Sequence, residues 1–150
     1  MVVLKKFYTK HITKKYINWL NDKQNLKYTS IKKINQNDVI KYVKRHQYNN
    51  KEKLYRIIYN NKHIGNLRIH YLDKSTATIG ILIGEKKFHS KGLGTDSIKQ
   101  AIKLIKNKNI RNIKAYVHIK NIISLKIFKK NNFRAKKINN DILLTYKIKN

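Results

Sequence analysis

Hydrophobic and polar positions along the chain follow two periods, one of two residues and one of about 3.6 residues. Seven segments have the alternation or the short apolar run of a β-strand, namely VVLKKF, LYRIIY, HIGNLRIHYL, TATIGILIG, IRNIKAYVHIK, FRAKKI and ILLTYKI. Four others carry apolar residues at the spacing of one helix face, and they begin near Thr9, after Asn37, just before Ile98 and at Ile122. The predicted order is therefore β, α, α, β, β, β, α, β, α, β, β.

The connections between these segments indicate how the strands pair. The segments NNK and DKS are short, polar and turn-forming, so the second, third and fourth strands are expected to form an antiparallel meander. The fifth strand, IRNIKAYVHIK, follows a helix and is expected to run parallel to the fourth. The last two strands form a hairpin at NND. The sequence predicts an α/β (mixed α+β) fold, with helices packed against a mixed sheet.

Length and composition restrict the organisation of the chain. Its 150 residues contain no change of composition, linker or repeat, so we expect one domain over residues 1–150. The absence of cysteine excludes a disulfide framework, a thiolate metal site and a cysteine nucleophile. Since no run approaches the roughly 20 apolar residues that span a bilayer, we expect a cytoplasmic protein without a membrane span.

The large positive charge of the chain is weaker evidence for a nucleic-acid partner than its magnitude suggests. A formal net charge of +29 is typical of nucleic-acid or anionic-membrane binding. Only five of the 36 basic residues are arginine, however, and nucleic-acid binders generally use arginine for phosphate and base contacts. A bias towards lysine, isoleucine and asparagine also follows from an A+T-rich genome. We therefore favour solvated lysine faces, keep a nucleic-acid-binding module as the alternative, and expect pockets to prefer anionic small molecules.

One loop carries the clearest chemical signal. The segment IGILIGEKKFHSKGLGTDSIKQAIKLI runs from a predicted strand into a helix and holds two of the five glycines within three positions, Gly92 and Gly94. Free amides at a helix start, the helix dipole and the close approach that glycine permits together form an anion cradle, to which Lys91 adds a cation. Neither G-x-x-x-x-G-K-[ST] nor the third glycine of the dinucleotide motif is present.

Together with VHIKNIISLKIFKKNNF about thirty residues later, this loop resembles the two central motifs of the GNAT superfamily of acetyl-CoA-dependent N-acetyltransferases. The family's Q/R-x-x-G-x-G/A stands as His89 to Gly94, with histidine where glutamine or arginine is usual. The later motif reads Asn121, Ser124 and Phe128, ending at Phe133. The resemblance covers nearly the full chain and implies a mostly antiparallel sheet of about seven strands with about four helices, splayed between the fourth and fifth strands.

The resemblance also implies which residues bind the cofactor, acetyl-CoA. The loop amides would bind the pyrophosphate, with two further residues at the entrance: Lys91, Gly92, Leu93, Gly94 and Thr95, then His89 and Ser90. The pantetheine arm would pair like an added strand with the backbone of Leu82, Ile83 and Gly84. Asn121 matches a position that usually touches the cofactor, and Phe128 lies in the same helix. The glycines could instead serve only a turn, and Asn121 could only cap its helix.

Catalysis requires a group that removes a proton from the acceptor amine and a donor for the leaving thiolate. The family often uses a glutamate before the loop and a tyrosine in the later helix, but these positions read Thr78 and Phe128 here. Strand alternation and proximity to the loop leave as candidates His118, which shares a polar face with Tyr116, and Glu85 and Tyr146. Direct transfer in a ternary complex needs little beyond orientation, so a site without a strong base remains workable.

The acceptor is expected to interact with the N-terminal segment YINWLNDKQNLKYTSIKKINQNDVIKYV. This segment looks like family members that acetylate nucleotide-linked amino sugars, and also like those that modify ribosomal-protein N-termini. Both acceptors remain open, whereas a polycation such as spermidine would be repelled. We favour core packing over ligand contact for Trp19, and expect a monomer or homodimer. A coenzyme A sensor without catalysis is a further alternative.

Overall fold

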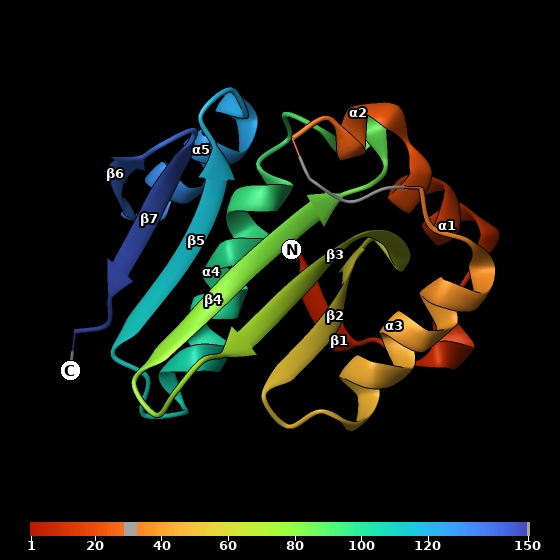
Figure 1. The fold of residues 1–150 in the computed structure, drawn as a ribbon, viewed down its shortest axis with the longest axis horizontal. Coiled ribbons are helices and arrows are strands. Elements are labelled where there is room, and N and C mark those ends of the chain that lie inside the picture. Colours follow the sequence, from red (N-terminus) through yellow and green to blue (C-terminus); the bar gives the residue numbers. More distant parts are fainter. Residues whose placement is uncertain (29–32, 150) are drawn as a thin grey trace.

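A computed structural model describes residues 1–28 and 33–149. Its centre is a seven-stranded sheet in the order β1-β2-β3-β4-β5-β7-β6 (Figure 1). The strands are β1 (Val3–Lys6), β2 (Glu52–Tyr59), β3 (Lys62–Tyr71), β4 (Thr76–Ile83), β5 (Asn112–His118), β6 (Arg134–Ile138) and β7 (Asp141–Lys147). β4 and β5 are parallel and every other neighbouring pair is antiparallel. The predicted mixed, mostly antiparallel sheet is confirmed.

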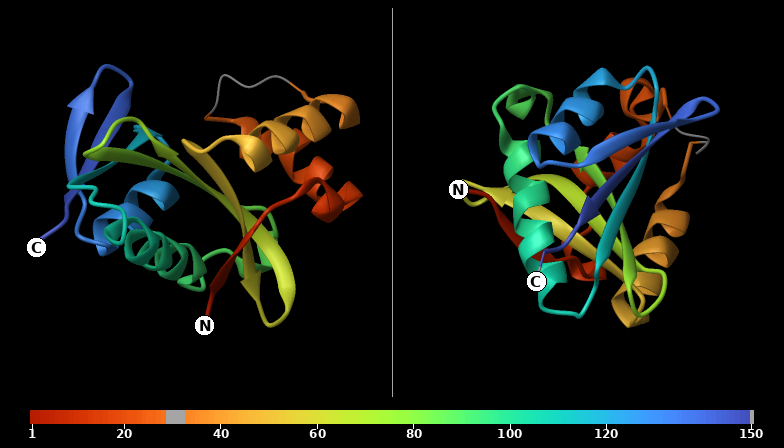
Figure 2. Two further views of the ribbon diagram at one scale, coloured as in Figure 1. Left: turned by 90° about the horizontal axis from the view of Figure 1, so that it is seen from below. Right: turned by 90° about the vertical axis from the view of Figure 1, so that its left-hand side faces the viewer.

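Helices cover both faces of this sheet. The structure contains α1 (Lys14–Asn21), α2 (Lys23–Leu26), α3 (Gln36–Tyr48), α4 (Leu93–Lys106) and α5 (Ile122–Lys130), with short 3-10 turns η1 (Thr9–His11) and η2 (Lys86–Phe88). Helices α4 and α5 lie on one face, and α1 to α3 lie on the other (Figure 2). Among the described residues, no helix combines the length and apolar character that crossing a bilayer requires.

The predicted meander is present, and both of its turns have a local cause. Asn60 and Asn61 connect β2 to β3 at φ 47° and 60°, in the left-handed region that asparagine tolerates. Between β3 and β4, Asp73 Oδ1 accepts the amides of Ser75 at 2.7 Å and Thr76 at 2.8 Å. The strand order from β2 to β4 is therefore specified by turn chemistry as well as by strand pattern.

The N-terminal region differs from its prediction as a single helix. It forms η1, α1 and α2, because two residues cap new helices inside the apolar pattern. Thr13 Oγ1 accepts the amide of Tyr16 at 3.1 Å and starts α1. Asp22 is extended, with ψ 126°, and its side chain accepts the amide of Gln24 at 2.9 Å to start α2. Residues 1–28 and 33–149 thus form five α-helices where about four were expected.

Two hydrophobic cores hold the layers together. The larger core lies between the sheet and α4 and α5, and the smaller one, beneath α1 and α3, consists of Phe7, Tyr16, Trp19, Val39, Val43 and Leu54. Trp19 is 6 % exposed, as the packing interpretation predicted. It lies against Gly84, where an added Cβ would come 2.0 Å from Trp19 Cδ2. The smaller core therefore depends on a side chain being absent at the end of β4.

A histidine beside the smaller core makes stability depend on pH. The His63 ring lies 5.0 Å from the Trp19 ring and 5.6 Å from that of Phe7, and burial lowers its pKa to about 4. The unfolded chain therefore binds this proton from about pH 6.5 downwards, whereas the folded protein does so only near pH 4. We expect the free energy of unfolding to fall by about 2 kcal/mol across this window, allowing for partial exposure.

Urea denaturation at pH 7.5 and 4.5 measures this loss, and His63→Leu is the comparison. The variant should lose part of the pH dependence. An equal pH dependence in both proteins would show that His63 does not cause it.

Candidate functional site

The sheet opens between its two parallel strands. β4 and β5 pair only at their first residues, Thr76 with Asn112, Ala77 with Ile113 and Thr78 with Lys114. Beyond Thr78 and Lys114 no pair joins the described strands, so their later halves diverge. The splay predicted between the fourth and fifth strands is therefore present, with its vertex at Thr78.

The direction of the backbone groups decides which residues face the splay. Gly84 donates its amide to the Ile64 carbonyl of β3 at 2.9 Å. Because this direction alternates along a strand, Leu82 also pairs with β3, whereas Ile81 and Ile83 turn their amides and carbonyls towards β5. Of the three residues predicted to pair with pantetheine, only Ile83 directs its backbone into the splay.

The opposite wall of the splay is formed by β5. Asn112 donates its amide to the Ser75 carbonyl at 3.0 Å, so alternate residues of β5 face β4. Tyr116 and His118 follow in the same direction past the vertex, and the His118 carbonyl accepts the Asn121 amide at 2.9 Å. The backbone of Tyr116 therefore lies across the splay from β4.

The glycine loop connects β4 to the start of α4. Gly92 is the N-cap residue, in the left-handed region at φ 77°, and its carbonyl accepts the Asp96 amide at 3.0 Å as the first helical bond. The amides of Leu93, Gly94 and Thr95 precede that bond and are the free donors of the helix start. Among the described residues, an added Cβ at Gly92 would meet no heavy atom within 4 Å. The position of a Gly92 side chain, one residue before these donors, is therefore open.

The second glycine of the loop has a different role. An added Cβ at Gly94 would lie 2.6 Å from Ile127 Cδ1 of α5, so Gly94 permits close packing of the two helices. Asn131, at the end of α5, strengthens this contact because its Nδ2 donates to the Thr95 carbonyl at 3.0 Å and to the Ile127 carbonyl at 3.1 Å. The Cβ position of Gly92 thus faces open space, whereas Gly94 lets α4 pack closely against α5.

His89 ties the loop to the strand before it. Its Nε2 lies 2.7 Å from the Ile83 carbonyl, which accepts the hydrogen bond, so Nε2 carries a proton. Ser90 follows with φ 59° and turns the chain towards Lys91. The histidine at the usual glutamine or arginine position therefore anchors the loop, and it occupies the Ile83 carbonyl.

Cations surround the entrance to the loop. Lys91 Nζ lies 5.8 Å and Lys87 Nζ 5.3 Å from the centre of the Phe88 ring. Lys86 Nζ forms an ion pair with Asp22 Oδ2 at 3.2 Å, which joins the loop to α2. Lys87 is paired as well, with its Nζ 3.9 Å from Glu85 Oε2. The described ion pairs do not include Lys91, which therefore remains as the cation for an anion at the loop.

The residues predicted in α5 serve its structure. Asn121 is the N-cap, and its Oδ1 accepts the Ser124 amide at 3.3 Å. Phe128 is 2 % exposed and its ring lies 5.1 Å from that of Phe133. The capping interpretation of Asn121 is correct, a cofactor contact by Asn121 stays a prediction, and Phe128 is a core residue with little surface for a ligand.

The structure does not bring the three catalytic candidates together. Tyr146 is opposite Ile113 on the face of the larger core and lies 5.4 Å from the Phe133 ring. His118 belongs to the other face of the sheet, where its ring stacks on Tyr28 at 5.3 Å. Its Nδ1 accepts the Lys120 amide at 3.1 Å, so a neutral His118 carries its proton on Nε2. The ring nitrogen of His118 that remains available is therefore a hydrogen-bond donor.

Glu85 is likewise engaged. Its Oε1 lies 2.8 Å from Lys15 Nζ, and this hydrogen bond holds the pKa of Glu85 below its ordinary value. A carboxylate stabilised in its ionised form is a weaker base than a free one. Glu85 therefore joins the loop to α1, whereas its catalytic role stays a prediction.

Sequence reasoning missed two residues on the face of β3 and β4 that carries α1 to α3. Arg68 of β3 is directly opposite Gly80 of β4, and an added Cβ at Gly80 would lie 4.0 Å from Arg68 Nε. The guanidinium thus lies near the strand that lines the splay. Alternation alone assigns Arg68 to a polar face, and only the register puts it beside a glycine.

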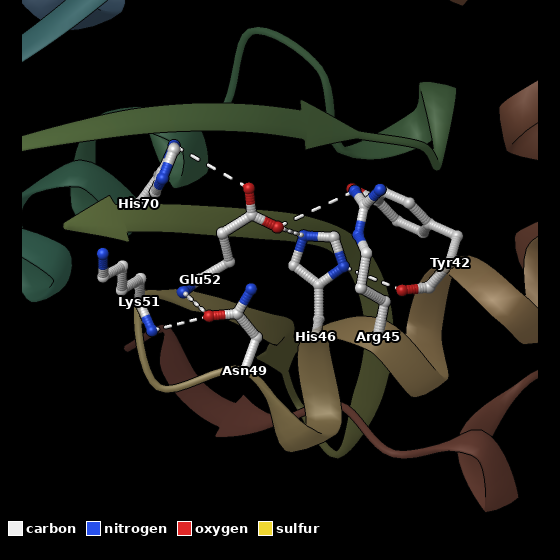
Figure 3. Close-up of polar contacts among 7 residues, drawn as sticks. All are labelled: Tyr42, Arg45, His46, Asn49, Lys51, Glu52 and His70. Atoms are coloured by element: carbon white, nitrogen blue, oxygen red, sulfur yellow. Dashed lines mark hydrogen bonds and ion pairs between the residues drawn. The ribbon is translucent and has the colours of Figure 1, made fainter. Parts of the chain in front are cut away.

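The same face carries a carboxylate that is surrounded by basic groups (Figure 3). Glu52 Oε2 lies 3.3 Å from His46 Nε2 and 3.7 Å from Arg45 Nη2, while its Oε1 lies 3.8 Å from His70 Nδ1. The His46 ring is buried, burial lowers its pKa, and its Nδ1 donates to the Tyr42 carbonyl at 2.8 Å. With its proton on Nδ1, a neutral His46 offers none to Glu52, so the permanent charge of α3 beside this carboxylate is Arg45.

Part of the segment expected to bind the acceptor, 29–32, lies outside the described residues. In the described part, Figure 1 shows α1 and α3 over β1 to β3, whereas β5 and β7 have no described helix in front of them. Tyr28, at the end of this described part, reaches His118 of β5. The N-terminal segment therefore does contact the wall of the splay.

Known proteins share this arrangement. A family model for the acetyltransferase (GNAT) domain matches residues 2–134. A domain from Methanocaldococcus jannaschii superposes with a TM-score of 0.85 at 19 % identity, covering 99 % of both chains. Aminoglycoside acetyltransferase AAC(6')-Ib in complex with coenzyme A gives 0.84 at 14 % identity, covering 98 % of this chain and 95 % of that one.

A third structure is the Campylobacter jejuni N-acetyltransferase PseH in complex with acetyl coenzyme A. It superposes with a TM-score of 0.73 at 18 % identity, covering 99 % of this chain and 100 % of its own. The comparison with curated proteins finds no match. At these identities the structural likeness shows a shared fold.

Proposed function

Because the chain belongs to the GNAT family of acetyl-CoA-dependent N-acetyltransferases, we propose that it moves the acetyl group to a primary amine by direct attack in a ternary complex. The observation that carries this proposal is the loop from Lys91 to Thr95, whose open amides and lysine lie at the mouth of the splay. A long thioester with an anionic pyrophosphate suits two diverging strands that lead to an anion cradle.

The cofactor would be held at two places. The amides of Leu93, Gly94 and Thr95 bind the pyrophosphate, with Lys91 as the counter-charge. The pantetheine arm pairs with the backbone that faces the splay, namely both groups of Ile81 and the amide of Ile83, since His89 already occupies the Ile83 carbonyl. This binding mode narrows the pairing first expected for Leu82, Ile83 and Gly84.

The reaction needs one bond to form and one to break. The neutral amine attacks the thioester carbonyl, the resulting tetrahedral intermediate expels the thiolate, and the amine proton leaves to water or to a side chain. In its neutral form His118 has Nε2–H available, and this group would donate a hydrogen bond to the leaving thiolate. Orientation in the splay supplies the remaining acceleration.

For the acceptor we propose an amino sugar on a nucleotide carrier, with a protein N-terminus as the alternative. The likeness of the N-terminal segment to family members that acetylate nucleotide-linked amino sugars supports this choice. The net charge of +29 suits a nucleotide pyrophosphate and also an acidic protein. The basic nucleic-acid-binding module remains the rival from another class.

Acetyl-CoA binding and free-thiol release test the proposed function. Calorimetry should detect acetyl-CoA at or below millimolar concentration, and thiol release should rise above hydrolysis when an amine of the acceptor class is added. Lack of acetyl-CoA binding would remove the proposal, and binding without transfer to any amine would favour a sensor. RNA or DNA affinity that persists at physiological salt, with a linear log–log salt dependence, would favour the rival.

A further inference from the structure

Arg68 occupies a special place relative to the splay. It is directly opposite Gly80, two residues past the vertex at Thr78, and so lies where β4 and β5 have already separated. In the described structure, the Gly80 Cβ position has one heavy atom within 4 Å, and that atom is Arg68 Nε. Gly80 thus leaves room on this face that a side chain would fill, and a guanidinium borders that room.

The charges near this room are unbalanced. On this face of β2 to β4 the carboxylate is Glu52, which contacts His46 and Arg45 of α3 and, through Oε1, His70 of β3. The charges of Glu52 and Arg68 both act on Tyr42 of α3, so this single carboxylate has Arg45 as well as Arg68 in its surroundings. On the side of β5, Thr78 of β4 pairs with Lys114, and this lysine adds a second cation at the vertex. The described ion pairs do not include Arg68 or Lys114. An amine that carries further positive charge is repelled here, whereas one that carries an anion is attracted.

The side chain of Arg68 is also suited to bind an anion. Arg68 is half-buried, so its charge is less screened than that of an exposed lysine. Its planar guanidinium can bind a carboxylate or phosphate group through two parallel hydrogen bonds.

On the basis of the proposed function, we propose that Arg68 selects the acceptor by binding an anionic group in the room above Gly80. The acceptor is therefore an amine that carries a carboxylate or a phosphate group. Lys114 at the vertex supports the same preference. Neutral amines and polyamines are poor substrates.

Two matched pairs of amines test this selection. Ethanolamine and phosphoethanolamine differ by a phosphate group, and 4-aminobutanamide and 4-aminobutanoate differ by a carboxylate. For each, kcat/KM is measured by thiol release, and the Kd for the protein loaded with coenzyme A is measured by calorimetry. The wild type should prefer the anionic member of at least one pair by about tenfold or more. The pair that shows the larger preference identifies phosphate or carboxylate as the ligand.

Arg68→Gln is the test variant, and Arg111→Gln is its control, because it removes the same charge from an exposed side chain before β5. R68Q should reduce the preference to about one, through a lower kcat/KM for the anionic member, and R111Q should keep the preference. Arg68→Lys should restore part of it. Circular dichroism and thermal melting verify that the variants are folded.

The outcomes separate this proposal from the proposed function. A preference that survives in R68Q, an equal loss in R111Q, or a wild type that prefers the neutral amines overturns the role of Arg68 while acetyl transfer stands. Absence of acetyl-CoA binding or of thiol release overturns the proposed function. In that case the ratio of the Kd values of each matched pair, measured by calorimetry on the protein without coenzyme A, decides whether Arg68 binds the anion.

Discussion

Gly92→Tyr should weaken acetyl-CoA binding at least a hundredfold while the protein remains folded. The Gly92 Cβ position is open among the described residues, so a side chain can leave the backbone here without a clash at its Cβ. A bulky ring at the N-cap stands next to the free amides of α4, where the pyrophosphate is proposed to lie. The backbone cost of a side chain at φ 77° is about 1–2 kcal/mol, which a folded domain tolerates.

The matched control is Gly92→Ala. It has the same backbone cost but little bulk, so it should retain most of the binding and melt at about the same temperature as Gly92→Tyr. Calorimetry with acetyl-CoA and a thermal melt of each variant give both numbers. Equal affinity in the two variants would mean that the cofactor does not occupy this space.

Gly84→Ala should lower the free energy of unfolding by about 3 kcal/mol, at the upper end of overpacking effects. The added Cβ would lie 2.0 Å from Cδ2 of Trp19, which is buried and cannot rotate away freely. Trp19→Ala alone should cost about 3–5 kcal/mol through the cavity that it leaves. In the Trp19→Ala background the same alanine enters empty space, so its cost should disappear.

Urea denaturation of the wild type, both single variants and the double variant completes this cycle. The coupling energy should favour the double variant by more than about 1 kcal/mol, since the two residues are in contact. Additive losses would show that the strain at Gly84 does not come from the indole ring.

The loop that is proposed to bind acetyl-CoA could be recognised from the sequence because its signal is local. The loop from His89 to Thr95 is one continuous segment, and each strand beside it has its own alternation or turn. The split of the first helix was missed because the caps at Thr13 and Asp22 are single hydrogen-bonding side chains that a helical period does not register. The family model over residues 2–134 agrees with the predicted family.

The residues that are proposed to bind the acceptor could not be predicted, because their position depends on the register between neighbouring strands. The pairing of Arg68 with Gly80 joins two strands across a turn, and the insertion of β7 between β5 and β6 turns Tyr146 towards the core. Alternation shows that successive residues of a strand point to opposite faces of the sheet. It does not show which residues of the next strand lie opposite them, or which helices cover each face. His118 and Tyr146 therefore looked equivalent in sequence and lie on opposite sides of the sheet.

The hydrogen bond from His89 to the Ile83 carbonyl has a mechanical consequence. It links the glycine loop directly to the end of β4, so a shift of the loop is transmitted to the strand. In the proposed binding mode, a cofactor bound through its pyrophosphate would be held in register with the strand beside its thioester arm. A displacement of the loop would then displace the reacting end of the donor as well.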